Sequence, residues 1–376
     1  MIYLDNNATT MIDPEVLEAM LPYLKELYGN PSGKYLLAHQ SQEAVNTSRQ
    51  QIAQLLNADP GEIIFTSGAS ESNNFILKGV SDAHRDKGNH IITSAIEHAS
   101  ILETCRYLET KGFIITYLPP TSEGIVTVES LQKSLTEKTI LASISWVNNE
   151  LGTINDIPAM ANFCADNNVF FHTDATQAIG KVRIDLKGNP INFLSFSGHK
   201  IYAPKGVGGC FIRKTKLGLK EKVTPIIHGG SQEFGYRAGT LAVPNIVGLG
   251  KAADIVFQNF DPHQSKLKLL DKELHSLLLQ KFNNIKFNGC KHTRVPGITN
   301  FLIPNTSNEL IIKKLSQEIA VSNGSACSAS KPSHVLQMIG LSLDQIRSSI
   351  RISVGKYNTP DELAYFVNRL AEIALE

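Results

Sequence analysis

A single lysine in a short run of small and polar residues is the sequence feature that most clearly points to chemistry. Residues 195–200 read Ser-Phe-Ser-Gly-His-Lys. Gly198 lets the backbone approach a ligand closely, and Ser197 and His199 carry hydrogen-bond donors on the same side of the turn. Lys200 could form a Schiff base with a carbonyl cofactor, provided that burial lowers its pKa. From its residue type alone, an ordinary surface lysine is the commoner interpretation.

Two other strand ends carry residues suited to such a cofactor. Asp174 follows the β-rich run 169–173. Its carboxylate could cap the next helix, or it could pair with the protonated ring nitrogen of a pyridoxal cofactor. Residues 65–73 form a strand, a loop of small residues and a helix start, and such a turn suits a phosphate because backbone N–H groups and the helix dipole point at it. This last signal is weak alone, since many α/β turns share it.

The elements that would position these residues alternate along the chain. Short β-rich runs are followed by amphipathic stretches, and several runs are apolar on both faces, as buried parallel strands are. We therefore expect an α/β fold with a mostly parallel sheet. The pattern predicts helices at 70–80 and 157–167, and strands at 62–65, 90–94, 113–118, 140–147, 169–173, 193–196 and 208–212.

The pattern changes after about residue 259. A long amphipathic helix is predicted at 265–282, and a last helix begins at about Pro360. Short strands are predicted between these helices, at 299–303, 319–322 and 350–354. We interpret this part as a smaller α+β domain. The predicted large domain spans 15–259, and the predicted small domain comprises 1–14 and 260–376.

Composition excludes several classes of function. The chain has 36 Lys+Arg against 35 Asp+Glu, a formal net charge of +1, which argues against binding nucleic acid or an acidic membrane surface. The sequence shows neither a membrane-spanning apolar run nor a signal peptide. Its five cysteines lack C-x-x-C spacing, which fits a reducing cytoplasm without disulfides or a metal site. A Rossmann dehydrogenase is disfavoured because no G-x-G-x-x-G follows an early strand.

Together with other short motifs, these features resemble the cysteine desulfurases of the NifS/IscS type. That family lies within the class V aminotransferase group of the fold-type I pyridoxal 5'-phosphate (PLP) enzymes. The resemblance covers nearly the whole chain, and the shared order of the motifs makes it specific. The motifs are at 3–10, 68–74, 97–98, 147–152, 172–177, 197–200, 237–240, 324–328 and 350–353.

The resemblance implies a large PLP-binding domain and a role for each matching residue. Lys200 holds PLP covalently, Asp174 pairs with the pyridine nitrogen, and Gln177 hydrogen-bonds the phenolic oxygen of the ring. His98 stacks on the ring as a catalytic residue. The implied phosphate ligands are Ala69, Ser70, Ser197 and His199, with Thr240 reaching the cofactor of the neighbouring subunit in a homodimer.

The resemblance also implies the substrate and the reaction. Arg351 binds the carboxylate of L-cysteine, and Asn149 contacts both substrate and cofactor. Cys327 is the nucleophile, because its thiolate takes the substrate sulfur and L-alanine leaves. The persulfide then passes to a protein sulfur acceptor, for iron–sulfur cluster assembly or thiolation. Cys327 stands in a run of small residues, 322–330, that predicts a surface loop in the small domain, whereas the other four cysteines are predicted to be core residues.

Two alternative functions stay open on the sequence alone. A selenocysteine lyase, or another PLP reaction on this fold, would not need the thiol of Cys327. A PLP-fold scaffold without turnover would not need Lys200 and His98. The sequence therefore favours an enzyme, a cysteine desulfurase. One departure from the family pattern is Gln-Glu-Phe at 232–234 in place of Gln-Glu-Arg, which removes a cation near the predicted site.

Overall fold

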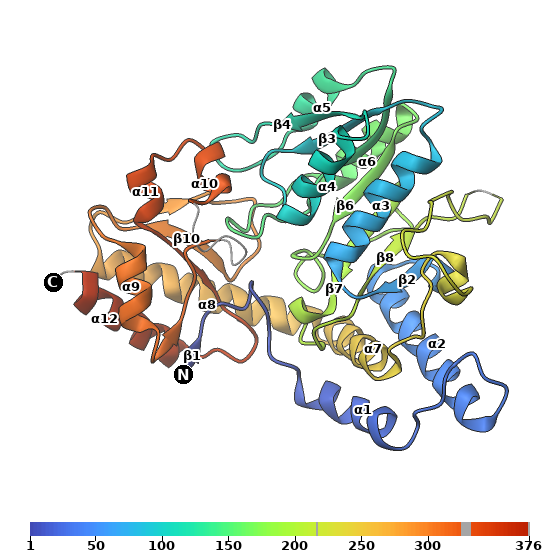
Figure 1. The fold of residues 1–376 in the computed structure, drawn as a ribbon. Coiled ribbons are helices and arrows are strands. Elements are labelled where there is room, and N and C mark those ends of the chain that lie inside the picture. Colours follow the sequence, from blue (N-terminus) through green and yellow to red (C-terminus); the bar gives the residue numbers. More distant parts are fainter. Residues whose placement is uncertain (216, 325–331, 375–376) are drawn as a thin grey trace.

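The computed structural model describes residues 1–215, 217–324 and 332–374, and its main feature is a seven-stranded sheet (Figure 1). Neighbouring strands are parallel except at β8, which runs antiparallel to both of its neighbours. The mostly parallel sheet expected from the sequence is therefore confirmed. In spatial order the strands are β2 (Ile63–Thr66), β8 (Gly208–Ile212), β7 (Phe193–Ser197), β6 (Phe170–Asp174), β5 (Thr139–Ser143), β3 (His90–Ser94) and β4 (Ile114–Leu118).

Helices cover both faces of this sheet, and the strands are apolar on both sides for that reason. Successive side chains of a strand point to opposite faces, so Ile91 and Leu141 join one core while Ile92 and Ala142 join the other. The first core is closed by α3 (Ala69–Ala83) and α4 (Ala99–Glu109). The second is closed by α2 (Leu36–Leu56), α6 (Ile157–Asp166) and α7 (Val243–Gln258), with α1 (Pro14–Lys25) and α5 (Val128–Ser134) at its margins.

A smaller antiparallel sheet with its own apolar core lies beside the large one (Figure 1). Leu4 belongs to the core of this small sheet, because β1 (Ile2–Tyr3) pairs with β11 (Ile319–Ala320). The division into two domains near residues 14 and 259 stays a prediction. The sheet has the order β12 (Ser349–Ser353), β10 (Ile298–Leu302) and β9 (Lys286–Asn288), and its helices are α8 (Phe260–Lys281), α9 (Asn308–Leu315), α10 (His334–Met338), α11 (Leu343–Arg347) and α12 (Pro360–Ala374).

The strand predicted at 140–147 is wrong at its end. Strand β5 stops at Ser143, and the following residues leave the sheet as a loop. Asn148 closes that loop, because its side-chain oxygen accepts hydrogen bonds from the backbone N–H groups of Glu150 (2.9 Å) and Leu151 (3.0 Å). The turn was not predicted because the apolar residues continue past the end of the strand. It places Asn149 at the predicted site.

Among the described helices, none is both long and apolar enough to cross a membrane. The same part of the chain holds no group of three or more His, Cys, Asp or Glu side chains arranged to bind a metal ion. Of the five cysteines, Cys105, Cys164, Cys210 and Cys290 are free thiols buried in the protein, which confirms their prediction as core residues.

A buried ion pair connects α2 to the segment that carries the sequence departure at 232–234. Arg49 on α2 contacts Glu233 at 2.6 Å, and the side chains are 8% and 1% exposed. Glu233 also accepts a hydrogen bond from the backbone N–H of Phe65 at 2.7 Å. The centroid of the exposed Phe234 ring lies 3.4 Å from the ammonium nitrogen of Lys220. Where the family pattern has an arginine, this chain therefore places an aromatic ring beside a lysine.

We predict that Glu233→Gln lowers the free energy of unfolding by about 3–5 kcal/mol, because it leaves the Arg49 charge buried without its partner. Urea unfolding checks this as a lower midpoint. The matched control is Glu103→Gln, which breaks the exposed pair with Arg106, 61% and 65% exposed, and should change the free energy of unfolding by less than about 0.5 kcal/mol. Equal effects of the two variants would contradict a structural role for the buried pair.

Candidate active site

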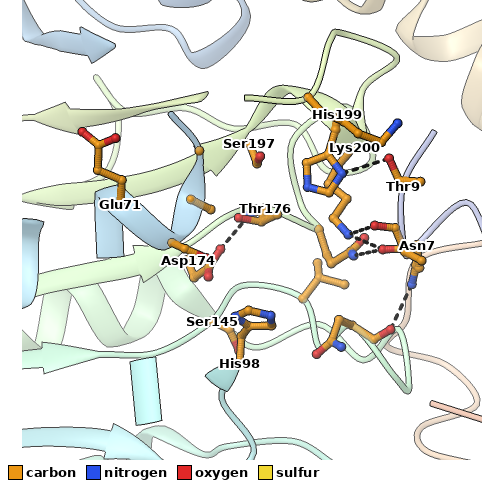
Figure 2. A pocket seen from close by; sticks show the side chains of 18 of the residues that line it. Asn7, Thr9, Glu71, His98, Ser145, Asp174, Thr176, Ser197, His199 and Lys200 are labelled. Atoms are coloured by element: carbon orange, nitrogen blue, oxygen red, sulfur yellow. Dashed lines mark hydrogen bonds between the residues drawn. The ribbon is translucent and has the colours of Figure 1, made fainter. Parts of the chain in front are cut away.

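The predicted site residues converge on one cavity of about 540 Å³ (Figure 2). It opens where β2, β3, β5, β6 and β7 end, which is where ligands bind in open α/β sheets. Helix α3 begins at this edge, and Arg351 reaches it from β12 of the small sheet. Ten of the twelve residues predicted from the sequence line the cavity: Ala69, Ser70, His98, Asn149, Asp174, Gln177, Ser197, His199, Lys200 and Arg351.

Lys200 enters the cavity from a short 3₁₀ turn, Gly198–Lys200, that directly follows β7. Its ammonium donates hydrogen bonds to the backbone carbonyls of Asn7 and Ala8, the latter at 2.8 Å (Figure 2). Gly198 makes the turn possible, since a side chain there would have its Cβ only 3.0 Å from Leu249 Cδ1. The N-terminal segment therefore supplies two neutral acceptors to the amine of Lys200.

Asp174 is the last residue of β6 and is 7% exposed. Its Oδ1 accepts from the backbone N–H of Thr176 (2.9 Å), and its Oδ2 accepts from the side chain of Asn73 on α3 (2.8 Å). The carboxylate thus caps the turn after β6 and also lines the cavity. In the described chain no helix follows β6 directly, so the carboxylate caps a turn instead of the helix that the first interpretation predicted, and its pairing with a ring nitrogen stays a prediction.

His98 lies at the N-terminus of α4, and its ring lines the cavity beside Asp174 (Figure 2). Its Nδ1 accepts a hydrogen bond from the backbone N–H of Ser100 at 3.1 Å, which leaves the ring proton on Nε2. Ser100 also accepts from Asn73, which in turn donates to Asp174. Burial lowers the pKa of His98, against the opposing effect of the Asp174 carboxylate, so the neutral ring is favoured.

The N-terminus of α3 is built to receive an anion. Gly68 caps this fifteen-residue helix without a side-chain hydrogen bond, so the first-turn N–H groups at Ala69 and Ser70 remain available to a ligand. The ring of His199 lines the same cavity, and its Nδ1 lies 3.1 Å from the hydroxyl oxygen of Thr9. Burial lowers the pKa of His199 to about 4, with the nearby lysine charges adding to the effect, so it acts as a neutral hydrogen-bonding group.

Arg351 is almost fully buried, at 2% exposed, where the small sheet meets the cavity. It forms an ion pair with Asp5 (2.7 Å) and donates to the backbone carbonyl of Asn149 (3.2 Å). Its Nε is buried and has no hydrogen-bond partner among the described residues. The guanidinium is therefore held rigidly beside Asn149, with donor capacity left over.

Comparison with known proteins identifies this arrangement. The aminotransferase class-V family model matches residues 2–366. A cysteine desulfurase IscS of Clostridium botulinum (strain Kyoto / Type A2) is 43% identical over 377 aligned positions, which cover 99% of this chain and 94% of that protein. The chain belongs to the cysteine desulfurases of the IscS/NifS type, within the class-V aminotransferase family.

Solved structures agree with this assignment. A NifS-like protein has a TM-score of 0.92 at 36% identity, covering 99% of this chain and 98% of its own. The protein SspA in complex with cysteine has a TM-score of 0.84 at 35% identity, covering 96% of this chain and 100% of its own. The sequence-based predictions of the family, the fold and the enzymatic activity are thereby confirmed.

Two predicted residues of this cysteine desulfurase are not placed in the cavity. Thr240 is exposed and is not part of the lining, so its role at the cofactor of a second subunit stays a prediction. Cys327, the predicted nucleophile, lies outside the described residues.

The sequence reasoning missed several residues that build the desulfurase site. Asn7 and Ala8 were part of an N-terminal motif, but their contacts with Lys200 use backbone carbonyls across more than 190 residues, which no local pattern reveals. Thr176 also lines the cavity, and its hydroxyl oxygen is buried without a hydrogen-bond partner among the described residues. Thr176 could have been predicted as a site residue, because it lies inside the motif 172–177.

Proposed function

We propose that this desulfurase converts L-cysteine to L-alanine with PLP held at Lys200 and delivers the sulfur through Cys327 to a protein acceptor. The observation that carries the proposal is the convergence of Lys200, Asp174 and the start of α3 on one cavity. Each supplies what one part of PLP requires, namely an amine, an anionic partner for a ring nitrogen, and an anion-binding helix end.

The residues present fit PLP. Asp174 faces the cavity with lone pairs left after two hydrogen bonds, and the buried hydroxyl of Thr176 lacks a partner among the described residues that a ligand oxygen would supply. The uncapped N–H groups at Ala69 and Ser70, together with Ser197 and His199, would hold the phosphate. Asp174 would hold the pyridine nitrogen, and Lys200 would bind the carbonyl carbon.

Bound there, PLP would supply an electron sink that stabilises negative charge next to the amino group of the substrate. Arg351 and Asn149 bind the substrate carboxylate and so orient the substrate in the cavity. Lys200 Nζ removes the proton from the α-carbon of cysteine, and the neutral ring of His98 is placed to hold or return a proton at Nε2. The thiolate of Cys327 then bonds to the substrate sulfur as the carbon–sulfur bond breaks. The bonding pair stays with the substrate carbon, which takes up a proton and leaves as L-alanine, and a persulfide remains on the enzyme.

The partners follow from this chemistry. The family relationship supports a protein that accepts sulfur for cluster assembly or thiolation, and we propose a homodimer in which Thr240 completes the phosphate site of the second subunit. SspA was solved in complex with cysteine, and this supports L-cysteine as the substrate here. The buried free thiols in the described part of the chain support a reducing, cytoplasmic compartment.

The test is product analysis with the PLP-loaded protein, L-cysteine and a thiol reductant. We expect L-alanine and sulfide in equal amounts, because one sulfur leaves with each turnover. A transaminase would instead accumulate the keto acid of cysteine, and a selenocysteine lyase would release alanine from selenocysteine but not from cysteine. Either product pattern would contradict the proposal.

A further inference from the structure

One partly buried lysine beside the cavity, Lys181, has no part in the chemistry described so far. Lys181 follows β6 in a segment of consecutive turns that also carries Gln177, four residues earlier. Its ammonium donates to Gln177 Oε1 at 2.6 Å and to Asn7 Oδ1 at 3.1 Å. Both partners are neutral amides, and in the described part of the chain no carboxylate forms an ion pair with Lys181. Withdrawing a cation even partly from water without a carboxylate partner is costly, and this arrangement calls for an explanation.

The orientation of the two amides explains the arrangement. Asn7 Nδ2 donates to the backbone carbonyl of Asn149 at 3.0 Å, and that carbonyl can only accept, so Asn7 must turn its oxygen to Lys181. Gln177 Nε2 donates to the backbone carbonyl of Asn7 at 3.1 Å, and its oxygen therefore also faces Lys181. The amide nitrogen of Gln177 carries two hydrogens, and one remains for a ligand in the cavity that Gln177 lines.

We propose that Lys181 is a positioning residue that fixes the Gln177 amide with its N–H group, rather than its oxygen, towards the cofactor. This inference rests on the proposed function, in which Gln177 donates to the phenolic oxygen of PLP. Without Lys181 only the hydrogen bond to the Asn7 carbonyl would hold the Gln177 amide, so the rotated amide, whose oxygen would repel the phenolic oxygen, would be populated more often.

The backbone supports this role. Hydrogen bonds from the N–H groups of Ile179 (2.8 Å) and Lys181 (2.8 Å) close two successive turns, and Gly180 between them has φ +74°. A side chain at Gly180 would place its Cβ 3.1 Å from Ile201 Cγ2, so this tight packing holds the base of Lys181 in place. Burial lowers the pKa of Lys181 to about 7, with the charges of Lys200 and Arg351 adding to the effect. A negatively charged ligand in the cavity would raise the pKa of Lys181 again. Lys181 would therefore carry its charge more fully when such a ligand is bound.

The test is a double-mutant cycle on the PLP-loaded protein with Lys181→Met, Gln177→Ala and both together. The readouts are the dissociation constant for PLP and the position of the visible absorption band of the bound cofactor. Lys181→Met should weaken PLP binding about three- to tenfold and shift the band, as expected when a hydrogen bond to a charged oxygen is lost. In the Gln177→Ala background the same change should add less than about twofold, because Lys181 acts through Gln177.

Lys187→Met, which removes an exposed lysine six positions further on, is the matched control and should leave both readouts unchanged. Lys181→Arg, which keeps a donor-only cation, should restore part of the affinity if Lys181→Met folds poorly. The inference is overturned if Lys181→Met has no effect, or if it weakens PLP binding equally in both backgrounds. Failure of the proposed function would look different, because the wild-type protein would then show no visible band with PLP.

Discussion

Replacing Lys200 with alanine is expected to lower the rate of alanine formation by at least about 10³-fold. Lys200 Nζ is the basic nitrogen that the fold holds in the cavity, against the backbone carbonyls of Asn7 and Ala8. Removing it would take away both the proposed covalent link to PLP and the proposed base for the substrate proton. The measurement is steady-state alanine production, with the visible spectrum recorded in parallel.

The matched control is Lys205→Ala, since Lys205 also lines the cavity but is exposed. That variant should keep the visible band of the bound cofactor. If Lys200→Ala retained alanine formation near the wild-type rate, the proton-transfer role assigned to Lys200 would be wrong.

The second large effect is expected from Cys327→Ser. The variant should bind L-cysteine with a spectral change like that of the wild type, because we assign substrate binding to Arg351 and proton removal to Lys200. Release of alanine should fall about 10³-fold or more, since a serine hydroxyl does not attack sulfur as a thiolate does. Stopped-flow absorbance and alanine assay on the same preparation separate these two stages.

Cys290→Ser serves as the comparison, because Cys290 is buried at 6% exposed and lines a different cavity. It should keep alanine formation, and radioactive sulfur from labelled cysteine should stay on the Cys327 peptide. Normal alanine release by Cys327→Ser would remove Cys327 from the reaction and favour a lyase mechanism.

Much of the fold was predictable because its signals are local. Strands β3 and β8 begin and end where the apolar runs predict, since both are buried on both faces and closed by polar or glycine residues. The meeting of Asp174 and Ser197 was also predictable, because parallel strands β6 and β7 are neighbours and end at one edge of the sheet. The register pairs Asp174 with Ser195, two residues before Ser197.

The features that sequence reasoning missed depend on long-range contacts. Asp5 pairs with Arg351 across 346 residues, and Arg49 pairs with Glu233 across 184. The role inferred for Lys181 depends on the orientation of two amides, which follows from backbone carbonyls brought in by tertiary packing. The end of β5 was missed because Ile144 and Trp146 continue the apolar run after the chain has left the sheet, where they pack into the core.

The central claim is that Lys200 holds PLP in this cavity, and peptide mapping of the borohydride-reduced, PLP-loaded protein tests it most directly. Reduction fixes the cofactor to its lysine, and digestion with mass spectrometry identifies that residue among Lys181, Lys200 and Lys205, the lysines in or beside the cavity. We predict one cofactor per chain, on the peptide that contains Lys200. Cofactor found mainly on Lys181, Lys205 or a lysine elsewhere, or no stable label at all, would contradict the account.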